Sequence, residues 1–165
     1  MMQVIEKPLD LPGTRTVVLD RWHRCPVTVQ VADTDYGGGV YHGTYFALYN
    51  QARDVFMEDL GVSYFSLMNQ GMNLSVAELH TRYLKPVRYG ENIQVLTRIS
   101  WLRSRSMGVV QKMVSVLPDT EEEILKNQVE MNLVCTDTKI GAVPLPEKLV
   151  KAIQTYYGSD GIKTV

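Results

Sequence analysis

The second half of the chain alternates between apolar and polar residues over four successive segments, and this pattern constrains the fold more than any other feature. The alternation is cleanest at residues 93–101 and 107–113. It continues through 129–135, and it fits 74–83 if a bulge shifts the register near Ala77. Because successive side chains of a strand point to opposite faces, each segment is typical of a half-buried strand. The pattern predicts four long antiparallel strands.

The first half has a different periodicity. Residues 26–32 alternate as a strand, and from residue 45 towards residue 60 apolar residues recur at steps of three and four, which predicts an amphipathic helix. Gly61 is suited to cap the end of this helix. Shorter helices are expected at 64–69 and 147–156. The apolar stripe of the long helix consists of Tyr45, Leu48, Tyr49, Ala52, Val55 and Phe56.

An amphipathic helix of this length, joined to four strands, predicts an α+β domain in which the helix packs across a curved sheet. The 165 residues suit one domain. We expect a leader at 1–20, the domain at 21–157 and a tail at 158–165. Within the leader, a short edge strand is expected at 15–19. One side of the helix is also available to a second subunit.

Composition excludes several functions. The net charge of -1 and the hydrophobic fraction of 45% do not favour binding to nucleic acids or membrane surfaces. No apolar run reaches the ~20 residues that span a bilayer, and the first residues lack the pattern of a secretory signal. Two cysteines, Cys25 and Cys135, are too few for a disulfide framework. We therefore expect a cytoplasmic protein.

The connection between the first strand and the long helix concentrates reactive groups. It contains Asp33, Asp35, three consecutive glycines at 37–39, and His42. The first N–H groups of a helix have no partner within the helix, so they can stabilise an oxyanion beside a carboxylate. Val40, Tyr41 and His42 are the residues expected to offer such N–H groups. The connection therefore suggests a site that attacks an acyl group.

Simpler readings of the same residues exist. Aspartates at strand-to-helix junctions often cap helices or brace turns, and a run of glycines can be a flexible turn. Other catalytic arrangements fail: the chain has no Gly-x-Ser-x-Gly elbow, and no Gly-Lys-Ser/Thr follows the glycines. Cys25 has no base near it in sequence, and the histidines and cysteines lack metal-ligand spacing. We expect no metal and no cofactor.

Several motifs resemble one family. They are Asp33-Thr34-Asp35, Val40-Tyr41-His42, the segments 82–88 and 101–106, and Pro144-Leu145-Pro146. In this order they resemble the hotdog-fold acyl-CoA thioesterases of the 4-hydroxybenzoyl-CoA thioesterase type, in particular the subgroup of the Tol-Pal-associated thioesterase. The resemblance covers roughly residues 24–149. It implies a hotdog fold, a homodimer that is often paired into a homotetramer, and active sites at the subunit interface.

The resemblance also implies catalytic roles. The second acid of the motif, Asp35, acts on the thioester either as a nucleophile or as a general base for water, while Asp33 is expected to brace the loop. The N–H of His42 is the strongest candidate to polarise the thioester carbonyl. The His42 side chain either hydrogen-bonds the thioester or positions water, or it packs against a partner subunit.

Contacts with the substrate are implied in the same way. Gly39, Tyr41 and Thr44 are expected to line the acyl site, where Tyr41 is equally suited to the interface core. Phosphates of coenzyme A need cations. The residues expected to bind coenzyme A are Arg103, Arg105 and Ser106 at one turn, and Lys85 and Arg88 at another.

The chain departs from the family pattern in three places: Thr44 replaces a common Asn, Asn50-Gln51 replaces Glu-Arg, and the leader is longer. The first two affect the pocket or its support and leave the substrate range open. The sequence thus predicts hydrolysis of an acyl- or aroyl-CoA thioester to the acid and coenzyme A. Two alternatives remain. One is a thioesterase for acyl chains on a carrier protein of a polyketide or fatty-acid pathway, and the other is a non-catalytic protein that binds acyl thioesters.

Overall fold

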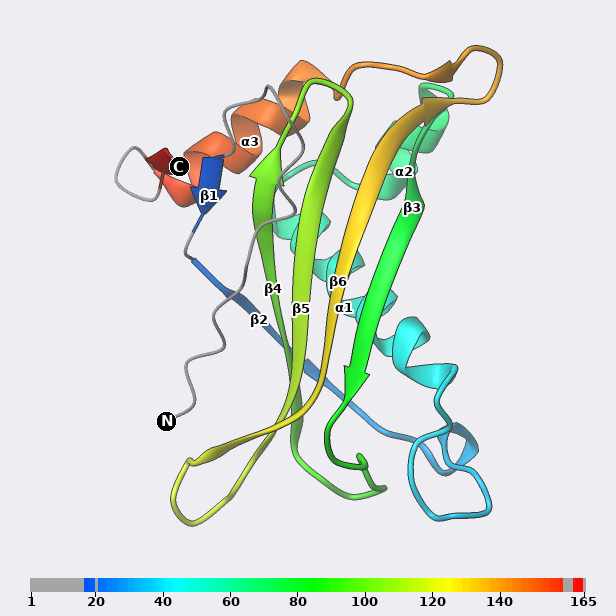
Figure 1. The fold of residues 1–165 in the computed structure, drawn as a ribbon, viewed down its shortest axis with the longest axis vertical. Coiled ribbons are helices and arrows are strands. Elements are labelled where there is room, and N and C mark those ends of the chain that lie inside the picture. Colours follow the sequence, from blue (N-terminus) through cyan, green and yellow to red (C-terminus); the bar gives the residue numbers. More distant parts are fainter. Residues whose placement is uncertain (1–16, 20, 159–161, 165) are drawn as a thin grey trace.

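The computed structural model describes residues 17–19, 21–158 and 162–164, and these form a curved antiparallel sheet with a long helix across one face (Figure 1). The sheet has the strand order β2-β4-β5-β6-β3, with β7 paired to β6. All of its pairings are antiparallel. The bounds of its strands are β2 His23–Val27, β3 Met72–Tyr83, β4 Ile93–Leu102, β5 Ser106–Val116, β6 Glu123–Asp137 and β7 Gly141–Ala142.

The four long strands confirm the alternating pattern of the sequence. The predicted bulge is present as well, since the pairing of β3 with β6 shifts between Val76 and Glu78. A second shift lies between Ile99 and Trp101 in the pairing of β4 with β5, and the sequence did not predict it. The second shift turns Trp101 to the face opposite to that of Ile99.

The helices also follow the predicted bounds closely. Gly61 has a φ of +74° and donates its N–H to the Glu58 carbonyl, which ends the long helix as predicted. Ser63 caps the start of the short second helix, because its side chain accepts the N–H of Ser66. The bounds are α1 Thr44–Asp59, α2 Tyr64–Asn69 and α3 Glu147–Tyr157.

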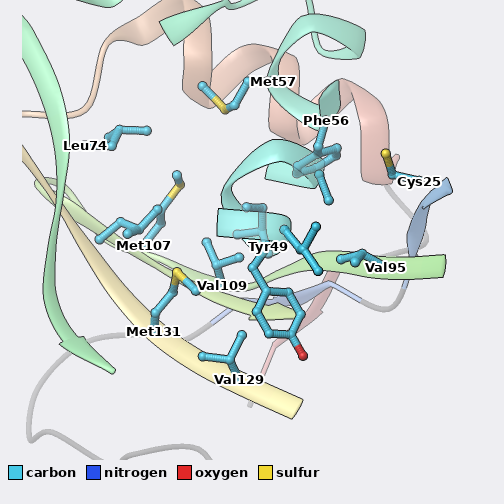
Figure 2. Packing of buried hydrophobic residues seen from close by; sticks show 14 of the residues in the cluster. Cys25, Tyr49, Phe56, Met57, Leu74, Val95, Met107, Val109, Val129 and Met131 are labelled. Atoms are coloured by element: carbon cyan, nitrogen blue, oxygen red, sulfur yellow. The ribbon is translucent and has the colours of Figure 1, made fainter. Parts of the chain in front are cut away.

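The core lies between α1 and the concave face of the sheet. Figure 2 shows Tyr49 and Phe56 of α1 among side chains of the strands, such as Val95 and Val129. The Tyr49 hydroxyl donates a hydrogen bond of 2.6 Å to Asn127 Oδ1 on β6, so the buried phenol has a partner. This arrangement confirms the predicted α+β architecture of a central helix wrapped by an antiparallel sheet.

One residue of the predicted apolar stripe is wrong. Val55 is exposed, whereas Met57, which the stripe omitted, is buried. α2 packs near the end of α1, and Val62 and Leu67 of this region belong to the same core as Met57. A stripe drawn for one isolated helix face does not include the contacts that the next helix adds.

The predicted first strand is shorter than expected and starts earlier. β2 ends at Val27, and residues 31–33 form a 3-10 turn instead of continuing the strand. The turn is closed by Asp33, which accepts the Gln30 N–H at 2.7 Å, and by Thr34 Oγ1, which donates to the Val31 carbonyl at 2.7 Å. As a result Val31 is exposed, although it fits the alternating pattern.

The two ends of the chain contain a small sheet. Residues Val17–Leu19 form β1 and pair in antiparallel fashion with β8, Ile162–Thr164. The predicted strand at 15–19 is therefore present over 17–19, and its first two residues lie outside the described part of the chain, as does most of the leader. β8 falls in the predicted tail, where no strand was expected. No helix in the described ranges is both long and apolar enough to span a bilayer.

Candidate active site

The glycine loop, defined here as residues 33–43, connects β2 and the 3-10 turn to α1. Asp35 lies at its tip, and its side chain Oδ1 accepts the Gly37 N–H at 2.8 Å. Its backbone closes the loop twice, because the Asp35 N–H donates to the Gly39 carbonyl at 2.9 Å and its carbonyl accepts the Gly38 N–H at 3.0 Å. The loop therefore fixes the backbone of Asp35 and one of its carboxylate oxygens, while the residue stays exposed in the single chain.

The glycines serve this geometry differently. Gly38 has a φ of +76°, a backbone conformation that is unfavourable for residues other than glycine. A Cβ at Gly37 would lie 3.1 Å from Asp35 Oδ1. Gly39 pairs with Arg88 in an isolated bridge, which attaches the loop to the segment after β3. The loop is thus a structured turn held by hydrogen bonds and not a flexible connection.

The prediction that three N–H groups are free is wrong for two of them. The Val40 N–H donates to the Val87 carbonyl and the Tyr41 N–H to the Asp33 carbonyl, each at 2.8 Å. Within the residues that the structure describes, the N–H groups of His42 and Gly43 have no such partner. The extended pairing of residues 40 and 41 delays the first turn of α1, so the free donors come after them.

The start of α1 is held from the side of the sheet. The Tyr83 hydroxyl of β3 donates to the His42 carbonyl at 2.9 Å. The rings of Tyr41 and His42 lie against each other, with 4.2 Å between their centroids. Thr44 begins α1 and donates its N–H to the Tyr41 carbonyl at 2.9 Å. Sequence reasoning missed Tyr83, because nothing in its strand pattern distinguishes it from a surface residue.

Tyr45 lies behind the loop in the core. Its hydroxyl accepts the Val87 N–H at 3.1 Å. Burial raises the pKa of Tyr45 above its ordinary value, and the negative charges of Glu91 and Asp35 raise it further. Tyr45 therefore stays a neutral phenol at physiological pH.

Of the five residues predicted to bind coenzyme A, the structure brings one directly to the loop. Arg88 Nη1 would lie 3.6 Å from a Cβ placed on Gly38. Lys85 is exposed on the same segment after β3, where its N–H donates to the Lys126 carbonyl.

Arg103, Arg105 and Ser106 lie at the other end of the strands, at the β4–β5 turn (Figure 1). Ser106 is level with Val134 and Ser75, whereas Tyr83 beside the loop is level with Asn127. At ~3.4 Å per residue, this difference in level is roughly 25 Å. A single chain therefore does not bring these three residues to Asp35.

The two cysteines lie in the core. Cys25 and Cys135 are both buried and unpaired, and burial raises the pKa of each thiol. The described residues contain no group of three or more His, Cys, Asp or Glu side chains that could hold a metal ion. The reactive groups of the loop are two carboxylates, an imidazole and backbone N–H donors.

The fold and this site define a class of protein. The chain shares its fold with 4-hydroxybenzoyl-CoA thioesterase bound to 4-hydroxybenzoyl-CoA, at a TM-score of 0.74 and 13% identity, over 81% of this chain and 99% of the other. The 1,4-dihydroxy-2-naphthoyl-CoA thioesterase of Synechocystis has a TM-score of 0.71 and 18% identity, over 81% and 96% of the two chains. The fold is the hotdog fold, as predicted.

The sequence comparisons show the family. The model of the thioesterase-like superfamily matches residues 29–153. The acyl-CoA thioester hydrolase YbgC of Escherichia coli O157:H7 is 32% identical over 133 residues, which are 80% of this chain and 93% of that protein. The chain belongs to the thioesterase-like superfamily, and the resemblance found in its motifs is confirmed. Its family and relatives support an enzyme that hydrolyses thioesters.

Proposed function

We propose that the protein hydrolyses the thioester of an acyl- or aroyl-CoA, and that Asp35 is its catalytic carboxylate. The observation that supports this most is the position of Asp35: its carboxylate is held by the Gly37 N–H in the loop that leads to the unpaired N–H groups of His42 and Gly43. A carboxylate and free donors at the start of one helix are what attack on a carbonyl requires. The relative YbgC is named an acyl-CoA thioester hydrolase, and the Synechocystis structure is that of a 1,4-dihydroxy-2-naphthoyl-CoA thioesterase.

Two routes are open to Asp35. As a general base, it takes a proton from water, whose oxygen bonds to the thioester carbon; the carbon–sulfur bond then breaks and the proton passes to the leaving thiolate. As a nucleophile, its own oxygen bonds to that carbon and expels the thiolate, and water hydrolyses the mixed anhydride. Both routes consume one water and release one acid and one thiol.

The oxyanion of either route needs donors. The His42 N–H is the donor we assign, and the Gly43 N–H is the next in line. α1 is 16 residues long, so the partial positive charge at its start adds to the stabilisation. The His42 side chain is exposed in the single chain and is placed to contact the thioester or a water. Gly39, Tyr41 and Thr44 are proposed to line the acyl site beside it.

A second subunit completes this site. β3 is an edge strand of 12 residues, with Val76 and Tyr83 exposed, and the neighbouring Leu84 is exposed as well. Long exposed edges of this kind pair with other strands. Antiparallel pairing of β3 with the same strand of a second copy would place the β4–β5 turn of one subunit near the loop of the other. We therefore propose a homodimer, further paired into a homotetramer, with sites at the subunit interface.

In such a dimer both subunits contribute cationic residues to the binding of one substrate molecule. Lys85 and Arg88 belong to the subunit whose Asp35 reacts, whereas Arg103, Arg105 and Ser106 come from its partner and meet the nucleotide. Neither Arg103 nor Arg105 has a carboxylate partner among the described residues, so both charges are available to phosphates. We also propose that the enzyme works in the cytoplasm, where coenzyme A thioesters are made and used.

Two alternatives are tested with the same protein. The release of thiol is followed across short, long, branched and aromatic acyl-CoAs. Competitive inhibition of hydrolysis by 3′-phosphoadenosine supports a coenzyme A substrate, because a site for a carrier protein does not recognise that nucleotide. Hydrolysis of acyl-phosphopantetheine groups on a carrier protein, without competition by the nucleotide, would favour the carrier-protein alternative. Binding of acyl-CoA without release of thiol, by a folded protein, would favour the non-catalytic alternative.

A further inference from the structure

The outer face of the sheet, which faces away from α1, has a surface pocket of about 590 Å³ at the end distant from the glycine loop. β3, β4, β5, β6 and the β4–β5 turn all contribute to it. Because Met107 and Val109 point into the core, Gly108 between them points to this outer face, and so does Trp101, which pairs with Gly108. The residues that line the pocket are Ala77, Glu78, Trp101, Arg103, Ser106, Asn132 and Val134.

The indole of Trp101 lies directly against Gly108. A Cβ placed on Gly108 would be 2.2 Å from the indole Nε1 and 2.5 Å from Cε2, distances that no real side chain tolerates. The indole therefore occupies the space that any other residue at 108 would fill. The register shift between Ile99 and Trp101 is what turns the indole to this face. The result is an aromatic surface laid on the sheet, half-buried and facing an open pocket.

The guanidinium of Arg103 lies over the indole of Trp101 and has no anionic partner among the described residues. The guanidinium carbon of Arg103 lies 5.0 Å from the centroid of the Trp101 ring. No hydrogen bond or ion pair from the Arg103 side chain is present in the described part of the chain, and the same holds for Arg105 two residues later. A gap of 5.0 Å is too small for another ring between them, so a ring that stacks on the indole must displace the guanidinium. Arg103 is then free to meet an anion beside that ring.

The carboxylate of Glu78 in the pocket already has hydrogen-bond partners, and this arrangement suits an uncharged nucleobase. Glu78 accepts a hydrogen bond from Asn132 Nδ2 at 2.9 Å, and its other oxygen is 2.9 Å from His80 Nε2. Both carboxylate oxygens of Glu78 therefore have a partner within the protein. The amide oxygen of Asn132 remains available to the exocyclic amine of a base. An aromatic platform, an arginine without an ion pair and an amide together fit an adenine nucleotide.

We propose that Trp101 is a stacking platform for the adenine ring of the coenzyme A thioester, with Gly108 making room for the indole and Arg103 turning to the phosphates. This inference rests on the proposed function, because it assigns the nucleotide end of that same substrate. Trp101 is a positioning residue and does not touch the thioester. It makes the affinity for the intact coenzyme A thioester higher than the affinity for a thioester of pantetheine alone.

Binding is tested without catalysis. The sequence has two tryptophans, so the Trp22→Phe protein reports on Trp101 alone. Titration with adenosine 3′,5′-bisphosphate is expected to quench the emission of Trp101 with saturation, and phosphopantetheine is expected to leave it unchanged. Arg103→Ala is expected to weaken the titration. Absence of saturable quenching by the nucleotide, in a folded protein of native oligomeric state, overturns the proposal.

Kinetics give the second test. Trp101→Ala is expected to raise the KM for acyl-CoA about tenfold, by the typical effect of one base-stacking contact, with kcat unchanged. The same variant is expected to hydrolyse the acyl-pantetheine thioester as the wild type does, and Trp101→Phe to recover most of the lost affinity. Gly108→Ala, which displaces the indole, is expected to act in the same direction. Equal losses on both substrates would indicate a structural role and overturn the assignment.

The two proposals fail in different ways. If the wild type hydrolyses both thioesters and Trp101→Ala affects neither, the platform is wrong and the thioesterase stands. If the wild type hydrolyses neither thioester, the proposed activity is wrong, and the fluorescence titration still decides whether Trp101 binds adenine.

Discussion

The Tyr83 hydroxyl donates a hydrogen bond of 2.9 Å to the backbone carbonyl of His42, and this contact joins the end of β3 to the start of α1. Partial desolvation of the hydroxyl, followed by the neighbouring Tyr45, raises the pKa of Tyr83, so the hydroxyl keeps the proton that it donates. The bonded carbonyl belongs to the peptide whose N–H is that of Gly43. Tyr83 therefore orients the backbone that offers the free donors of the site.

Replacing Tyr83 with Phe removes this bond while keeping the ring. We expect the free energy of unfolding to fall by about 1 kcal/mol, the usual net value of such a bond, and kcat to fall by up to about tenfold because the donors lose their orientation. Tyr89→Phe is the matched control, since Tyr89 is exposed and has no hydrogen bond from its side chain in the described ranges. An equal kcat in both variants would mean that Tyr83 only supports the fold.

Gly38→Ala tests whether the shape of the loop matters for the reaction. Gly38 (φ +76°) and Gly141 (φ +95°) both adopt left-handed conformations, and neither has a neighbour closer than van der Waals contact at its Cβ position. Alanine at either position is expected to cost about 1 kcal/mol of stability. Only Gly38→Ala should also lower kcat, because only that loop holds Asp35. Comparable activity of the two alanine variants would count against a fixed loop.

The sequence predicts the repeating parts of the structure better than the connections. The four long strands, the bulge near Ala77 and the glycine end of α1 follow from local patterns. The first strand does not, because Asp33 and Thr34 close a turn around Val31 through side-chain bonds that an alternating pattern does not reveal. β8 was missed because its pairing partner, β1, is more than 140 residues away in the chain.

The site divides along the same line. The position of Asp35 in its loop follows from the order of residues between strand and helix. The donors differ from the prediction, since the N–H groups of Val40 and Tyr41 donate to the carbonyls of Val87 and Asp33. These backbone contacts form only when the loop folds, and the order of residues does not reveal them. The pairing of Trp101 with Gly108 was also missed. Its only signal is a large residue opposite a glycine across a hairpin, and this becomes visible once the register shift is known.

Stability should decline in alkali because of buried phenols. Burial is the main cause that raises the pKa of Tyr49 and of Tyr157 above the ordinary value of 10.0. Above about pH 10 the unfolded chain loses these protons while the folded chain keeps them, so the free energy of unfolding falls as the pH rises. Urea unfolding between about pH 9 and about pH 11 measures this decline.

Tyr49→Phe separates the contribution of one phenol. At neutral pH it should be less stable by about 1–3 kcal/mol, because Asn127 loses the hydrogen bond of 2.6 Å. Its stability should then fall less steeply than that of the wild type above about pH 10. Parallel slopes for the two proteins would mean that the Tyr49 phenol does not contribute to the alkaline decline.

The most direct measurement compares kcat for acyl-CoA hydrolysis in Asp35→Asn and Asp33→Asn. Both variants lose one carboxylate charge from the same loop, but Asp33 closes the 3-10 turn through the Gln30 N–H, whereas Asp35 holds its carboxylate at the loop tip. We predict that kcat falls about 10²- to 10⁴-fold in Asp35→Asn, with the fold and oligomeric state retained, and that Asp33→Asn keeps most of its activity. Turnover close to that of the wild type in a folded Asp35→Asn protein would contradict the assignment of Asp35.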